Sequence, residues 1–320
     1  MKKLVSLLFF IILLLVGCSE STSKDDNKET NNQEILKIYT TIYPLLDFSE
    51  KIGGEFVEVE NIVPTGADAH SFEPTNKTMI KIAEGDMFIY LGTGIEGFTD
   101  AVINAMKNED TKIINSSEGV RLISSSESLN ETESEEEEEE HADENEGDNV
   151  PHVWLDPQRS IQLAENIKNA LVEMKPEQKE YFEENFNLLK KDLEQLDLSF
   201  KSMVEQSPNK TFIVSHSAYG YWQDAYGLEQ VGISGLSPSN EPSQKSLEGI
   251  IKVAENRDIK YVLFEQNVEN RVAEVIKREI GADTLTLHNL ESLTEEDVKN
   301  NEDYISVMEK NIETIRQVLK

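Results

Sequence analysis

Four residues with metal-binding side chains lie beside short apolar runs of this 320-residue chain. His70 lies in a glycine-containing loop, His216 ends the run FIVSH, His152 precedes a helix-like segment and Glu291 follows the last apolar run. Three imidazoles and one carboxylate suit four-coordinate Zn²⁺. A single histidine in such a place is more often a hydrogen-bonded structural residue. The chain has only five histidines, however, and three of them occupy ligand-like positions, so together they favour a metal site. Spacing alone does not establish that they converge in space, which requires comparison with a known fold.

The apolar runs are typical of buried parallel strands. In the first half they are residues 35–42, 57–64, 87–92 and 112–115, and in the second half they are residues 211–215, 230–234, 261–266 and 284–288. Helix-like segments between them are residues 43–53, 75–84, 246–256 and 268–280. This alternation predicts an α/β fold of two doubly wound lobes with mainly parallel sheets. Open sheets of this kind bind ligands at the carboxyl ends of their strands.

The segment 176–206 predicts one long helix between the two lobes. Its apolar residues recur at steps of four and three, which places them on one face of a helix: Phe182, Phe186, Leu189, Leu193, Leu196, Phe200 and Met203. Thirty-one residues would span about 46 Å, enough for a rigid linker across both lobes. The alternative is the seam of a coiled-coil dimer. The predicted lobes are residues 35–175 and 207–320.

The N-terminus predicts export and lipid anchoring. Two lysines precede a 13-residue apolar run, and Leu15-Val16-Gly17-Cys18 follows the order of the bacterial lipobox, which it resembles. The resemblance implies a signal peptide over 1–17 and a diacylglycerol on Cys18, while the apolar run is too short to span a membrane. A plain secretory signal is the alternative. Residues 18–34 read as a disordered tether, and the lone cysteine excludes a disulfide framework.

The charge is strongly negative and unevenly distributed. The formal net charge is -32, of which residues 131–148 supply -12, within an acidic loop of about residues 124–149. Removing that stretch leaves -20, which disfavours nucleic acid and suits a cation. The stretch itself predicts a disordered solvated segment. The alternative is a weak auxiliary zinc site, for which His141 would be the only imidazole.

Four motifs in this order resemble the metal-binding lipoproteins of ABC importers, and more narrowly their high-affinity zinc-uptake type. The motifs are GADAHSFEPT (66–75), PHVWLDPQ (151–158), SHSAYGYW (215–222) and LESLT (290–294). They are accompanied by an acidic loop before the second motif and a long helix between the second and third. The resemblance covers the chain from residue 35. It implies two α/β lobes joined by a rigid helix, with the metal in the interlobe cleft.

The resemblance carries over to four positions of this sequence. It makes His70 and His152 the metal ligands of the first lobe, and His216 and Glu291 those of the second. Manganese-type members place a carboxylate where His216 stands, so histidine favours zinc. Water or another acid could replace Glu291, which would then be a helix cap or a surface residue. Asp156 and Glu73 could orient imidazoles, while Asp156 could instead cap the following helix.

The function that follows is an extracytoplasmic zinc receptor, anchored to the cell membrane by lipid, that passes Zn²⁺ to an ABC-type permease. It would act as a monomer and catalyse no reaction. Within the family, the alternative is a manganese or iron receptor. From other classes, the alternatives are a zinc-dependent hydrolase, which would need an open coordination position and a general base, and a surface adhesin.

Overall fold

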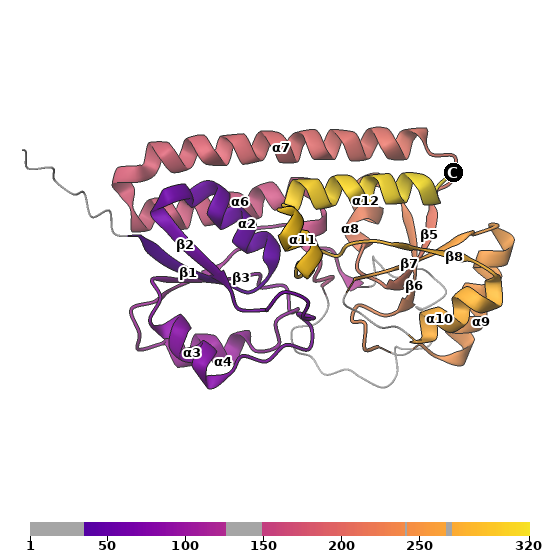
Figure 1. Ribbon diagram of the computed structural model, residues 1–320, viewed down its shortest axis with the longest axis horizontal. Coiled ribbons are helices and arrows are strands. Elements are labelled where there is room, and N and C mark those ends of the chain that lie inside the picture. The colour runs from indigo at the N-terminus through magenta and orange to yellow at the C-terminus, as the bar shows by residue number, and fades with distance from the viewer. Residues whose placement is uncertain (1–34, 126–148, 241, 267–270) are drawn as a thin grey trace, which may run out of the picture. The chain divides into compact units, whose positions relative to one another are not determined.

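The structure is a computed structural model that describes residues 35–125, 149–240, 242–266 and 271–320 (Figure 1). The predicted signal peptide, Cys18, the tether and the acidic stretch 131–148 lie outside the described residues. Residues 35–320 form one compact unit. Within the described ranges, no helix combines the length and the apolar character that a membrane span requires.

The first sheet contains four parallel strands in the order β2-β1-β3-β4. These are β1 (Leu36–Thr40), β2 (Val57–Asn61), β3 (Met87–Tyr90) and β4 (Lys112–Asn115). The helices α2 (Tyr43–Gly53), α3 (Asn76–Ala83) and α4 (Thr99–Met106) connect them. The order changes direction between β1 and β3, which is the switch point where open α/β sheets bind ligands.

The second sheet repeats the first in strand order and direction. Its strands are β5 (Thr211–His216), β6 (Glu229–Ser234), β7 (Tyr261–Phe264) and β8 (Asp283–Thr286), in the order β6-β5-β7-β8 and all parallel. Its connecting helices are α8 (Gly220–Tyr226), α9 (Gln244–Asn256) and α10 (Arg271–Ile280). The predicted α/β fold with two doubly wound lobes and parallel sheets is therefore confirmed.

A layer of long helices crosses both sheets (Figure 1). It consists of α6 (Pro157–Met174), α7 (Lys179–Gln206) and the C-terminal α12 (Tyr304–Val318). The predicted long helix begins at Lys179 rather than at residue 176, because Pro176–Gln178 form a separate 3-10 turn, η3. All seven residues of the predicted apolar stripe are buried, and α7 packs against α2, α6 and α12. The stripe thus packs inside the chain, as the linker interpretation predicts, and is not exposed for a coiled-coil seam.

One continuous apolar core joins the two sheets through this helical layer. It contains residues of the first sheet such as Ile38, residues of α7 such as Leu193 and residues of the second sheet such as Phe212. The short elements η1 (Gly54–Phe56), η2 (Val153–Leu155) and α11 (Glu295–Asn300) complete the fold. Because the core is continuous, loops from the two halves of the sequence are held in fixed contact above the strand ends.

Candidate metal centre

His70 lies in the loop between β2 and α3. Gly66 has φ of 78°, a conformation that suits glycine, and its N–H donates to Leu293 O at 2.9 Å. The His70 N–H donates to Asp68 Oδ1 at 3.0 Å. Next to it Ala69 is fully buried, so the loop is anchored while the His70 side chain keeps an exposed fraction of 11%. This ring is the part of the site nearest to solvent.

His152 is fully buried and immediately precedes η2. Its backbone position is fixed from the first sheet, since the Thr93 hydroxyl donates to Pro151 O at 2.8 Å. Its ring lies beside the indole of Trp154, with 5.3 Å between ring centroids. That indole donates through Nε1 to Asn289 O at 2.8 Å. The segment therefore holds His152 and also contacts the loop that carries Glu291.

His216 is the last residue of β5, a strand in which every residue is buried. Its Nδ1 contacts the carboxylate of Glu265, which lies just beyond β7. Because a carboxylate only accepts hydrogen bonds, Nδ1 carries the proton in this contact. The lone pair of Nε2 is then free to bind a metal, and it faces the other imidazoles.

Glu291 lies in the loop between β8 and α11. The preceding Leu290 has φ of 60°, which costs a branched residue roughly 1–3 kcal/mol. Contacts with the first half of the chain offset that cost: Glu291 O accepts from the Tyr43 N–H at 3.0 Å, and Glu291 Oε2 accepts from the Ala69 N–H at 3.3 Å. Glu291 is buried, and Thr294 caps α11, so the cap and surface interpretations of Glu291 are wrong.

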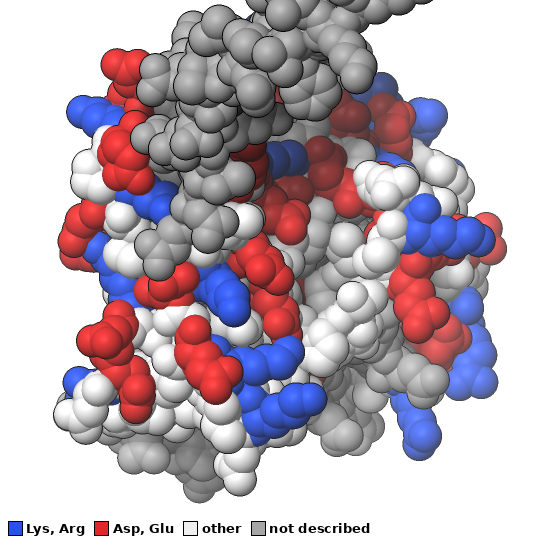
Figure 2. Space-filling model, turned by 60° about the vertical axis from the view of Figure 1, so that its left-hand side comes forward, with Lys and Arg blue, Asp and Glu red and all other residues white. Residues whose placement is uncertain are grey.

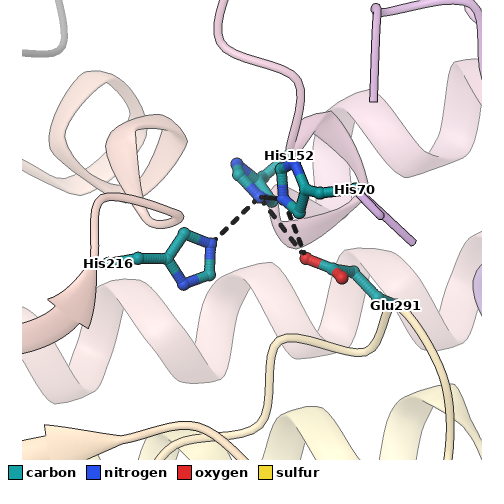
Figure 3. Close-up of side chains that lie close together, drawn as sticks. All are labelled: His70, His152, His216 and Glu291. Carbon is teal, nitrogen blue, oxygen red and sulfur yellow. Dashed lines mark hydrogen bonds and ion pairs between the residues drawn. The ribbon is translucent and has the colours of Figure 1, made fainter. Parts of the chain in front are cut away.

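The four side chains converge on one point (Figure 3). His152 Nε2 lies 3.2 Å from His70 Nε2 and 3.3 Å from His216 Nε2. Glu291 Oε1 lies 3.4 Å from His70 Nε2 and 3.5 Å from His152 Nε2. Zinc bonds of about 2.0–2.2 Å place the corners of a tetrahedron about 3.3–3.6 Å apart. These four separations are close to that spacing, and all four candidate ligand atoms lie within 4.8 Å of one another, so the cluster approaches the size of a tetrahedral zinc site.

The electrostatics of the cluster suit a bound cation. Burial lowers the pKa of His152 to about 3, so its ring is neutral at pH 7. Burial alone would raise the pKa of Glu291, but the rings of His152 and His70 beside its carboxylate outweigh that effect and lower the pKa. The buried Glu291 Oε1 makes no hydrogen bond by distance and angle with any described residue. Lone pairs that face each other in a buried site repel unless a cation lies between them, and the donor set therefore fits Zn²⁺.

Asp156 and Glu73, the two residues suggested to orient imidazoles, lie in different surroundings. Asp156 caps α6, accepting from the Gln158 N–H at 2.8 Å, and pairs with Arg159, so the capping interpretation is confirmed. Glu73 is exposed and makes no contact with an imidazole among the described residues. Glu265 was not among the predicted site residues. The only available signal was an acidic residue at the end of the apolar run YVLFEQ, close to the carboxyl end of a predicted strand.

Comparison with known proteins adds three similarities. The zinc-binding lipoprotein AdcA of Streptococcus pneumoniae is 35% identical over 99% of this chain, which spans 61% of that relative's length. The high-affinity zinc uptake system protein ZnuA of Bacillus subtilis is 33% identical over 96% of this chain and 94% of its own length. The crystal structure of the Zn(II)-bound ZnuA-like domain of Streptococcus pneumoniae AdcA covers 89% of this chain and 99% of its own, with a TM-score of 0.72 and 34% identity.

A family match covers nearly all of the described residues. The family described as zinc-uptake complex component A, periplasmic (ZnuA), matches residues 38–318, which include both sheets, the helical layer and all four converging side chains. The AdcA and ZnuA relatives align with nearly the whole chain, and the crystal structure has a similar fold, so both agree with the family match. The chain belongs to the ZnuA family of zinc-uptake components.

Proposed function

We propose that this protein is an extracytoplasmic receptor that binds one Zn²⁺ and delivers it to an ABC-type permease. The ligands would be Nε2 of His70, His152 and His216 and Oε1 of Glu291. The observation that carries the proposal is the spacing of these atoms, from 3.2 to 3.5 Å for four of their pairs. Zinc would be the cargo of the protein, held until the permease receives it.

The ligand set favours zinc over manganese. Three imidazoles and one carboxylate suit Zn²⁺, while Mn²⁺ prefers more oxygen ligands, and zinc stands above manganese and iron in the affinity order for divalent ions. Four protein ligands would also complete a tetrahedron. A zinc hydrolase keeps one position open for water, so the closed set favours binding without catalysis, in keeping with a family of uptake components.

Retention at the membrane would depend on Cys18, which lies outside the described residues. One relative is named a lipoprotein, which agrees with the lipobox-like order before Cys18. On the view of the described surface in Figure 2, acidic and basic side chains are interspersed. We expect the lipid on Cys18 to hold the protein at the membrane. Substitution of Cys18 by alanine should release it into the medium, and full retention in the membrane fraction would contradict this part of the proposal.

The central experiment is a metal analysis followed by a competition titration. Protein purified without chelator should contain about one zinc per chain, and the stripped protein should bind Zn²⁺ far more tightly than Mn²⁺. Equal or preferred binding of Mn²⁺ would reject the zinc assignment. Uptake of labelled zinc by cells that lack the protein, with and without its restoration, would then test delivery to the permease.

A further inference from the structure

We infer that Glu265 is a positioning residue of the zinc site, which fixes the tautomer and orientation of His216 and makes the loaded site electrically neutral. The inference rests on the proposed function, because it concerns how the same four ligands hold zinc. Glu265 itself is not one of those ligands. It acts on the metal through the ring of His216.

The sheet places Glu265 and His216 side by side. β5 and β7 are neighbouring parallel strands, and their register pairs Val214 with Leu263. Side chains alternate between the two faces along a strand. His216 and Glu265 each lie two residues beyond this pair and therefore share its face. The contact follows from the strand order β6-β5-β7-β8, which brings together residues 49 positions apart.

The contact selects one tautomer of His216. Glu265 Oε2 accepts from Nδ1 of His216 and also lies 3.2 Å from the Ser215 hydroxyl. With the proton held on Nδ1, Nε2 has its lone pair directed at His152 Nε2, 3.3 Å away. The opposite tautomer would direct an N–H at the metal position and could not bind. Such outer partners of metal-binding histidines also raise the basicity of the ligand.

The charge of Glu265 balances that of the loaded site. Zn²⁺ with Glu291 and three neutral imidazoles carries a net charge of about +1. Glu265 contributes -1 from a side chain that is only 1% exposed, so the buried group sums to zero. Asp68 is also near, but it is partly exposed and accepts from the His70 N–H and the Ser71 hydroxyl. A buried net charge is costly, so the second acid lowers the cost of holding a divalent ion.

The other buried imidazole has no such partner. Nδ1 of His152 makes no hydrogen bond with any residue that the structure describes. Packing against Trp154 holds that ring, while a carboxylate holds the ring of His216. Among the described residues, Glu265 is therefore the acid that contacts the outer nitrogen of a site imidazole. Of the site imidazoles, His216 should therefore be the one that loses a hydrogen-bond partner when the charge of Glu265 is removed.

The test compares Glu265→Gln with Glu96→Gln. Glutamine has nearly the volume of glutamate, so packing is kept, but its amide can donate to Nδ1 and hold the wrong tautomer. Zinc affinity, measured by competition with a chromophoric chelator, should fall about 10- to 100-fold in Glu265→Gln. Glu265→Asp keeps the charge and should recover part of that loss. Glu96 is a buried glutamate bound to Thr41 and the Leu91 N–H, away from the imidazoles, and its variant should bind zinc like wild type.

A second measurement needs no folded variant of Glu265. Nitrogen NMR of histidine-labelled wild-type protein, at a pH where its imidazoles are neutral, should show His216 with a strongly hydrogen-bonded proton on Nδ1. In zinc-loaded protein, Nε2 should be the metal-bound nitrogen. His216→Ala assigns the signals among the five histidines.

The outcomes separate the inference from the proposed function. A proton on Nε2 of His216 in metal-free wild type would overturn the inference, as would a folded Glu265→Gln variant that binds zinc within twofold of wild type. Failure of wild-type protein to bind zinc would overturn the proposed function instead. A weakened Glu265→Gln with the expected Nδ1 proton in wild type supports both.

Discussion

His152 and His216 are equally buried, yet they are held in different ways. His152 packs against an indole, and burial lowers its pKa to about 3. Burial would also lower the pKa of His216, but the charge of Glu265 and its hydrogen bond, together with the charges of Glu291 and Asp68, outweigh burial and raise that pKa. The comparison indicates that, at equal burial, a carboxylate at the outer nitrogen can reverse the direction in which the pKa of an imidazole moves. The ring of His152 is thus held by packing, and the ring of His216 by a charged neighbour.

The first prediction compares alanine variants of these two residues and has the largest effect. Both His152→Ala and His216→Ala should lose more than the roughly 100-fold in zinc affinity that outer partners contribute. Glu291→Ala should lose less than His216→Ala, because water replaces a carboxylate oxygen more readily than an imidazole. Competition titrations of the three variants check the order. An equal loss in all three would contradict it.

The same two variants should differ in stability without metal. Both lose the packing of one buried ring, but only His216→Ala leaves the buried carboxylate of Glu265 without its imidazole donor. That loss costs about 1–3 kcal/mol in the free energy of unfolding. Denaturant unfolding of the metal-free proteins measures it, and adding Glu265→Gln to His216→Ala should recover part. If His152→Ala were the less stable, packing would matter more than charge.

The second prediction tests whether a carboxylate at position 216 can bind Mn²⁺ once the charge of Glu265 is removed. His216→Asp introduces a carboxylate, a harder ligand that suits Mn²⁺, but it places that carboxylate near Glu265, and the two like charges repel. The single variant should therefore bind both metals poorly. The double variant His216→Asp with Glu265→Gln should bind Mn²⁺ better than the single variant does. Parallel titrations with Zn²⁺ and Mn²⁺ measure this, and equal Mn²⁺ binding by the two variants would weaken the role given to Glu265.

The third prediction concerns pH. Protons compete with zinc for the imidazoles, so affinity falls as pH falls. Because the pKa of His216 is raised, protons begin to compete with zinc for that ring at a higher pH. His152, with a pKa of about 3, takes up no proton between pH 5 and 6. The slope of log affinity against pH should therefore stay below three in this range. The sequence alone, with ordinary pKa values near 6.5, predicts a slope that approaches three. A measured slope of three would mean that His152 is not held as neutral as its burial implies.

The sequence predicted the strands well because their signals are local. Buried parallel strands are continuous apolar runs, as at 87–90, and the stripe of α7 is visible from its spacing alone. The contacts of the site are not local. Glu265 reaches His216 only because β7 lies beside β5. The left-handed backbone of Leu290 depends on contacts between Glu291 and residues more than 200 positions earlier.

The Glu291 loop also depends on contacts that are distant in the sequence. Its place in the sequence follows β8, but its hydrogen bonds run to the first half of the chain. Ser292 Oγ donates to Ala67 O at 2.6 Å, and the Gly66 N–H donates to Leu293 O at 2.9 Å. Sequence order identifies the element that a ligand follows. The partners of its loop follow from the packing of the two sheets under one helical layer.

The last prediction concerns the acidic stretch and has the smallest expected effect. Residues 131–148 lie outside the described part of the chain, but the residues on either side of the gap meet. Ser124 and Asn149 form an antiparallel bridge, and the Val150 N–H donates to Ile123 O at 2.9 Å. A short glycine-serine linker could therefore replace residues 126–148 without moving His152, whose position depends on Thr93 and Trp154.

In this replacement, the equilibrium zinc affinity should change less than about twofold. The rate of zinc capture at low salt could fall through lost attraction, and added salt should remove that difference. A large loss of equilibrium affinity would show that the acidic stretch belongs to the zinc site. Packing against His152 and the charge beside His216 would then not be the whole support of that site.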